Sequence, residues 1–99
     1  KAGVPSAREM QLLALVVVER SGLEVADLFK RETGNSISPG SLYTTFRRLR
    51  EAGWVKARSD EDEDGRVRYF KLTGTGVEVL NAARAHYARL ARFGLTEEA

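Results

Sequence analysis

The sequence predicts a mostly helical fold with one small β-hairpin, in a single domain of 99 residues. Serine and threonine residues precede several apolar stretches of helical spacing, as helix N-caps do. Between residues 54 and 72 the pattern changes to alternating apolar and polar residues, which is typical of paired strands. With 42% hydrophobic and 30% charged residues, the composition is that of a folded domain with a modest core.

The first helix is expected to begin after Ser6 and to end at Gly22. Ser6 can cap this helix, and Glu9 can reach back to complete a capping box. The three valines at residues 16–18 would by propensity favour a strand. The cap, the length of the apolar run and the closing glycine nevertheless favour a largely buried helix.

A second, shorter helix is expected over residues 23–34, with Gly34 closing it. Val25, Leu28 and Phe29 would share one face of this helix and pack against the core. Acidic residues near its start and basic residues near its end complement the helix dipole.

The third helix has the clearest end signals, from its N-cap at Ser38 to its end at Gly53. The proline after the cap fits the first helical position. Leu42, Phe46 and Leu49 have helical spacing and are expected to face the core. The side chains left facing outward are Ser41, Thr44, Arg47, Arg48 and Glu51.

Two β-rich runs, at residues 54–59 and 66–72, flank an acidic turn and predict a hairpin. Aspartates alternate along residues 60–64 and a glycine follows, as at the opening of an EF-hand calcium loop. The last ligand of such a loop should be a glutamate, but Lys71 occupies that position and a β-run replaces the expected helix. The acidic turn is therefore expected to be a solvated hairpin tip without a metal.

Thr73 caps a long final helix, whose apolar and small residues recur every three or four positions. These residues exceed what one thin domain needs to cover, so a partner helix would bury the remainder. The alternative is an ordinary amphipathic helix that packs on its own core.

The charge pattern indicates a polyanionic partner. Residues 60–64 hold five of the fourteen acids, so the rest of the chain carries sixteen bases against nine acids. Twelve of the bases are arginine, which suits forked contacts with phosphate and guanine. An arginine-rich genome composition would explain the same count.

Several classes of function are excluded by residues that the sequence lacks. Without cysteine there are no disulfides and no thiolate sites. His86 is the single histidine, and no motif supplies a nucleophile, a base and an orienting acid together, so we expect no enzyme and no cofactor. No apolar run is long enough to cross a bilayer, so a cytoplasmic protein without a membrane partner is expected.

The expected order of elements is that of a winged helix-turn-helix module over residues 6–73, with a dimerisation helix added over residues 74–93. In such a module the third helix enters the major groove of DNA, and the hairpin, or wing, lies against the flanking backbone. Ser38, Ser41 and the free amides of the first turn would then hold phosphate oxygens. Arg47 and Arg48 would reach base edges or phosphates. Alternatively, each is merely a solvated position on a surface helix.

The stretch "ISPGSLYTTFRRLREAGWV" resembles the third helix of PadR-type transcriptional regulators. "GRVRYFKLTGTGVEVL" is similar to the second wing strand and the start of the last helix in that family, and "SGLEVADLFKRETG" to its intervening helix. The resemblance covers roughly residues 6–92, and its motifs are specific in combination rather than singly.

The resemblance implies a DNA-binding regulator, commonly a repressor, that acts as a homodimer on a palindromic operator. It assigns a phosphate contact to Tyr43, wing contacts to Arg66 and Arg68, and much of the dimer interface to the last helix. The residues expected at the DNA are Ser38, Gly40, Ser41, Tyr43, Thr44, Arg47, Arg48, Lys56, Arg58, Arg66 and Arg68. Those expected at the dimer interface are Val77, Leu80, Ala83, Tyr87 and Leu90.

Three positions depart from the family pattern. Thr44 stands where the family usually has proline, which bears on DNA contact, whereas Leu23 and Phe70 each replace a tyrosine and look like packing variation. The acidic tip is a further departure, and like-charge repulsion from phosphate predicts that it stays in solvent while the strand stems face the DNA.

The resemblance also implies that short members of the family can hold planar hydrophobic ligands at the dimer centre. Such binding goes with a tryptophan on the last helix that stacks on the ligand. Here the only tryptophan, Trp54, begins the wing, although Tyr87 and Phe93 could still line a pocket for a small hydrophobic ligand. Two alternatives remain open. One is a winged-helix protein-interaction module with little DNA affinity. The other is a MarR-like regulator, against which the short length and the Leu42-Tyr43 pair argue.

Overall fold

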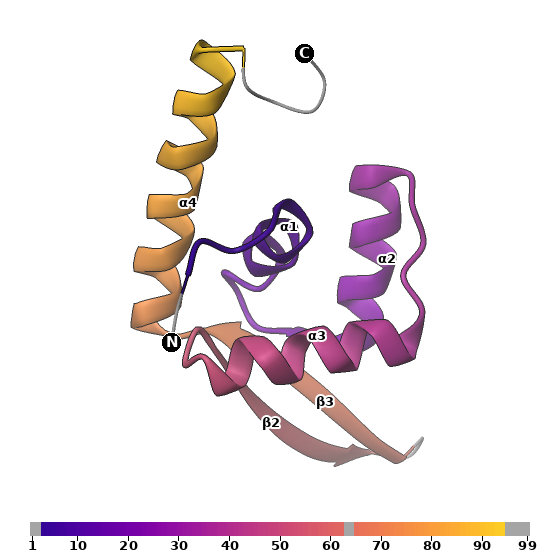
Figure 1. Cartoon of the computed structure of the whole chain (residues 1–99). Coiled ribbons are helices and arrows are strands. Elements are labelled where there is room, and N and C mark those ends of the chain that lie inside the picture. Colours follow the sequence, from indigo (N-terminus) through magenta and orange to yellow (C-terminus); the bar gives the residue numbers. More distant parts are fainter. Residues whose placement is uncertain (1–2, 63–64, 95–99) are drawn as a thin grey trace.

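The structure, a computed structural model, describes residues 3–62 and 65–94. Its elements are α1 (Ala7–Leu15), β1 (Arg20–Ser21), α2 (Gly22–Thr33), α3 (Pro39–Glu51), β2 (Val55–Asp62), β3 (Gly65–Leu72) and α4 (Gly74–Arg92). Helix α1 lies at the centre, α2 and α3 flank it, the β2–β3 hairpin projects below α3, and α4 rises along the other side (Figure 1). The predicted fold class, a winged helix-turn-helix with an added C-terminal helix, is confirmed.

Helix α1 is shorter than the sequence predicted, because it ends at Leu15 rather than near Gly22. The carbonyl of Val16 accepts a hydrogen bond from the amide of Leu72 on β3, at 2.9 Å. Residues 20–21 then pair with β3 as a third strand, β1, which the sequence did not predict. Residues 16–18 therefore belong neither to α1 nor to a strand, and they form the turn that brings the chain to β3. Gly22 opens α2 instead of closing α1.

The C-terminal end of α2 and both ends of α3 agree with the prediction, whereas α2 begins after Ser21, which was expected to lie in the first helix. Ser21 caps α2 with a capping box, and Gly34 ends it in the left-handed conformation, at a φ of 78°. The Ser38 hydroxyl accepts a hydrogen bond from the Ser41 amide at 3.1 Å and so caps α3. The buried residues of α3 are Leu42, Thr45, Phe46 and Leu49, so the predicted apolar stripe is confirmed.

The sheet has the antiparallel order β1-β3-β2, so β3 is its central strand. Its register pairs Val55 with Leu72 and Ala57 with Phe70. Phe70 is buried and stacks on Phe46 of α3, with 4.4 Å between ring centroids. This contact attaches the base of the wing to the helical core, whereas residues 58–61, 65 and 66, farther out on the hairpin, are exposed.

Thr73 caps α4 as predicted, and the helix begins tightly against the wing. Gly76 lies so close to the carbonyl of Trp54 that a side chain would not fit there. Leu80 and Ala83, expected at a dimer interface, are buried in the subunit's own core. They are therefore core residues of the fold. No helix in the described part of the chain is long and apolar enough to span a membrane.

Candidate nucleic-acid interface

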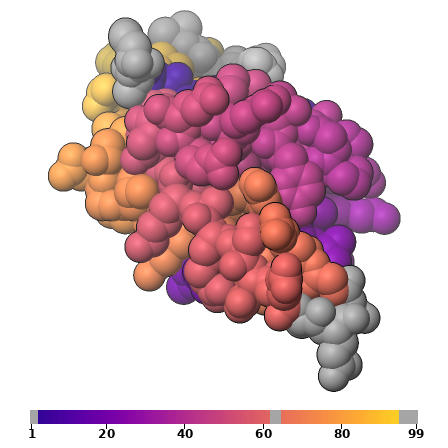
Figure 2. Space-filling view, turned by 90° about the horizontal axis from the view of Figure 1, so that it is seen from below, coloured from indigo at the N-terminus to yellow at the C-terminus, as the bar shows by residue number. Residues whose placement is uncertain are grey.

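Helix α3 and strand β3 border an open groove on the lower face of the molecule. Figure 2 views this face from below and shows the C-terminal part of α3 beside the strands of the wing. The groove is lined by Tyr43, Thr44, Arg47, Arg50, Arg66, Arg68 and Phe70. Four of the lining side chains are arginines, and no lining residue is acidic. The groove is therefore a concentrated site of positive charge.

The local periodicity of each element explains why these residues meet. Tyr43, Arg47 and Arg50 are spaced by four and three residues, so they share one face of α3. Arg66 and Arg68 alternate with residues of the other sheet face and point to the same side as Phe70. Since Phe70 is fixed in the core, its burial sets the face on which the two wing arginines lie.

Tyr43 forms the end of the groove nearest α2. Its ring lies 6.0 Å from that of Phe70, and the side chain stays 41% exposed. The hydroxyl lies against Gly22, the first residue of α2, where any larger residue would clash with it. The tyrosine therefore offers its exposed edge and hydroxyl beside the first turn of a second helix, where amide groups favour anions.

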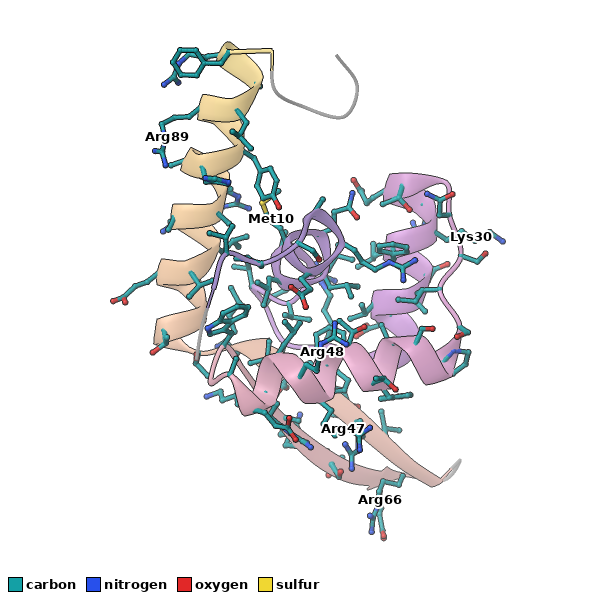
Figure 3. The ribbon with its side chains drawn as sticks, in the orientation of Figure 1. Met10, Lys30, Arg47, Arg48, Arg66 and Arg89 are labelled. Carbon is teal, nitrogen blue, oxygen red and sulfur yellow. The ribbon has the colours of Figure 1, made fainter. Side chains whose placement is uncertain are left out.

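Arg47 and Arg48 point to opposite sides of α3, as Figure 3 shows. Arg47 lines the groove, whereas Arg48 turns toward α1 and donates a hydrogen bond to Glu9 at 3.0 Å. Partial burial raises the pKa of Glu9, but hydrogen bonds from the Ser6 amide and from Arg48 outweigh this effect and lower the pKa overall. Arg47 is therefore available to a ligand in the groove, whereas Arg48 is already paired with Glu9.

A second hollow lies on the α1 side of α3, around the Arg48–Glu9 pair. It is lined by Ser6, Arg8, Glu9, Gly40, Ser41, Thr44, Thr45 and Arg48. Thr44 borders both this hollow and the groove, so it lies on the outermost ridge of the helix. Gly40 and Ser41 are exposed near the start of α3, while the Ser38 hydroxyl oxygen already accepts the capping hydrogen bond.

The four basic wing residues predicted at the DNA divide between the two faces of the hairpin. Arg66 and Arg68 face the groove. Lys56 and Arg58 stand opposite Lys71 and Tyr69 in the register, which places them on the other face. Their common charge does not distinguish the two faces, whereas the register of the hairpin does.

Arg50 is a groove residue that the sequence reasoning missed. It follows Arg47 by three residues, and this spacing could have identified it as a neighbour on the same helical face. Its position near the end of α3 places it toward the base of the wing.

The described part of the acidic turn is consistent with a solvated tip. Asp60 and Glu61 are exposed, and Arg66 approaches Glu61 only to 3.8 Å. The predicted tip residues 63 and 64 lie outside the described residues. Within the described part of the chain, no group of three or more potential ligands is placed to hold a metal ion.

The outer part of α4 extends beyond α1 (Figure 1). Tyr87 is half-buried and donates a hydrogen bond to the Pro5 carbonyl at 2.9 Å, and Leu90 is also half-buried. Val77 is 43% exposed and Phe93, just after the helix, is 73% exposed. Among the described residues, the subunit itself covers these apolar side chains only in part.

Solved structures with the same fold include several transcriptional regulators. A padr family transcriptional regulator from Eggerthella lenta is 22% identical, with a TM-score of 0.78 over 86% of this chain and 75% of that one. A transcriptional regulator from Clostridium thermocellum is 20% identical, with a TM-score of 0.76 over 86% of each chain. At these identities the similarity establishes the fold alone.

Bacillus subtilis PadR, solved in complex with operator DNA, is 22% identical, with a TM-score of 0.69. The match covers 78% of this chain and 47% of that one, so this chain spans about half the length of that relative. No curated protein matches the sequence.

The family model that matches is that of the transcriptional regulator PadR-like family, over residues 12–82. The match extends from α1 through the wing to the middle of α4, so it includes every side chain that lines the groove. Members of this family regulate transcription and are not enzymes. The chain belongs to the transcriptional regulator PadR-like family.

Proposed function

We propose that this protein binds duplex DNA, with α3 in the major groove and the wing along the adjacent backbone. The observation that carries the proposal is the groove between α3 and β3, where four arginines converge without an acidic residue in its lining. The complex of Bacillus subtilis PadR with operator DNA supports it, because that protein shares this fold.

The geometry supports a division of roles among the groove residues. Arg47 is at the middle of α3 and has a forked donor set, which suits the edge of a guanine. Arg66 and Arg68 extend along the wing and suit phosphate contacts, as does the exposed edge of Tyr43. Arg50 joins them at the base of the wing.

Residues at the start of α3 would supply further contacts. Gly40, Ser41 and Thr44 are exposed in the N-terminal half of α3. Ser38 caps the first turn of this helix. Backbone amides at a helix N-terminus favour phosphate oxygens. Arg48 would contribute only by leaving Glu9, so we assign it a smaller part in binding.

We further propose a homodimer that represses transcription from a palindromic operator. The exposed apolar side chains of Val77 and Phe93, with the half-buried Tyr87 and Leu90, are available to a second copy of α4. A two-fold dimer would present two α3 helices to major grooves about 34–36 Å apart. A small hydrophobic ligand could bind between the apolar ends of the two α4 helices.

Selection of bound fragments from random duplex DNA, followed by titration of the winners with salt, tests the DNA-binding proposal. Each phosphate contact removed should lower the slope of log affinity against log salt by about 0.9. Arg68→Ala should show this reduction, whereas Arg31→Ala, which removes an exposed arginine paired with Asp27 on α2, should leave the slope unchanged. Recovery of no preferred sequence and no salt-dependent binding would favour a protein-interaction module instead.

A further inference from the structure

The outer half of the wing has few attachments to the body of the protein. Strand β1 pairs with β3 only at Arg20–Phe70 and Ser21–Tyr69. Beyond Tyr69 toward the tip, β2 is the only strand beside β3 among the described residues, yet this is the part that carries Arg66 and Arg68. A two-stranded hairpin is only marginally stable by itself and depends on contacts with other elements. A contact from the side of the wing can therefore help to set where those arginines lie.

Arg58 on β2 makes that contact. Its Nε and Nη2 groups donate to the two carboxylate oxygens of Glu19, at 2.9 and 2.8 Å, in a forked ion pair. Its Nη1 group donates to Asp60 at 3.1 Å. The guanidinium also lies 4.4 Å from the centre of the Tyr69 ring.

Glu19 belongs to the turn between α1 and β1, which is part of the body. Within the described part of the chain, the Arg58–Glu19 pair is the salt bridge that joins the wing to the rest of the protein. The hydrogen bond from Arg58 lowers the pKa of Glu19. Partial desolvation opposes this effect, and the positive charges of Arg58, Lys71 and Lys56 add to the lowering. The pair is accordingly ionised at neutral pH.

We propose that Arg58 and Glu19 form a wing latch, a positioning pair that fixes the angle of the wing so that Arg66 and Arg68 face α3. In this view Arg58 orients the wing rather than binding phosphate, and its place on the far face of the hairpin is consistent with that role. The consequence for DNA binding rests on the proposed function, but the latch itself is a property of the free protein.

The direction in which one substitution changes the DNA affinity distinguishes a latch from a direct DNA contact. Glu19→Gln removes a negative charge beside the wing and releases Arg58 from its forked ion pair, leaving the contact with Asp60. If Arg58 binds phosphate, both changes strengthen DNA binding. If the pair positions the wing, the same substitution weakens DNA binding although the protein has become more basic.

The position of the wing can be measured without DNA. The chain has no cysteine, so Glu32→Cys on α2 and Glu61→Cys on the wing introduce two unique sites for spin labels. Double electron–electron resonance then gives the distribution of distances between them. Excess unlabelled chain is added so that very few dimers contain two labelled subunits. We expect one narrow distribution for the parent and clearly broadened ones for Glu19→Gln and Arg58→Gln. Glu78→Gln, on α4, is the matched control and should leave the distribution unchanged.

Unchanged distributions in both latch variants would overturn the proposal whether or not the protein binds DNA. With DNA, each latch variant should lose about two- to five-fold in affinity, the range that an exposed ion pair allows. The double variant should lose no more than either single one, because both remove the same interaction. Tighter binding by Glu19→Gln would also overturn the latch, while failure of the parent protein to bind any DNA would count against the proposed function alone.

Discussion

Replacing Arg47 and Arg48 separately should have different effects on DNA affinity. The two residues are of the same type and adjacent in the sequence, but they lie in different surroundings. Arg47 lines the basic groove, whereas Arg48 is paired with Glu9 on the other side of α3 (Figure 3). A forked contact between arginine and guanine contributes about 1–3 kcal/mol. Arg47→Ala should therefore weaken binding to a selected operator by about 5- to 150-fold.

Arg48→Ala should act mainly on the fold. The Arg48 side chain is 57% exposed, so solvent screens its ion pair with Glu9. Its loss should lower the free energy of unfolding by at most about 1 kcal/mol. We expect the operator affinity of this variant to fall by less than about five-fold, since the pair occupies Arg48 in the free protein.

Fluorescence anisotropy with a labelled operator duplex at fixed salt gives the affinities, and urea unfolding gives the stabilities. Arg31→Ala serves as the control for removing one exposed arginine that pairs within its own helix. Equal losses of affinity for Arg47→Ala and Arg48→Ala, or no loss for Arg47→Ala, would refute the assignment of the groove as the base-reading surface.

Three further predictions concern the fold and the dimer. Gly76→Ala should lower the melting temperature clearly in a thermal scan, because the added carbon would overlap the Trp54 carbonyl, and an unchanged value would contradict this packing. The pKa of Glu9 is lowered in the fold, so the stability it contributes is present above the unfolded-state pKa and is lost as pH falls through the folded-state pKa. Urea unfolding as a function of pH should show a smaller acid loss in Glu9→Gln than in the parent, and equal losses would argue against this role. Val77→Glu should shift the monomer–dimer equilibrium toward monomer in sedimentation experiments, because it places a charge on the exposed face of α4, and an unaltered equilibrium would locate the interface elsewhere.

Much of the fold could be predicted because local signals and tertiary packing agree along most of the chain. The third helix has a serine cap, a proline after it and an apolar stripe, and all three features appear in α3. The end of α1 could not be predicted in this way, because the amide that donates to the Val16 carbonyl belongs to Leu72, which is far along the sequence. The strand β1 was missed for the same reason, since a two-residue strand has no periodicity of its own.

The candidate site was only partly predictable. The sequence identifies the basic residues, but it does not by itself give the face on which each side chain lies or the residue with which it pairs. The inward positions of Phe70 and Leu72 imply that Arg66 and Arg68 share their face, and this could have been inferred from alternation. The engagement of Arg58 with Glu19 could not, since those residues meet only after the wing folds back along β1.

The most direct test of the central claim, that the groove between α3 and β3 reads DNA, is an NMR titration of arginine side chains with a selected duplex. The Nε–Hε signals of Arg47, Arg50, Arg66 and Arg68 should shift or broaden as DNA is added, while that of Arg31 on α2 stays in place. Changes confined to arginines of α2 or α4, with the four groove signals unmoved at saturation, would contradict the account.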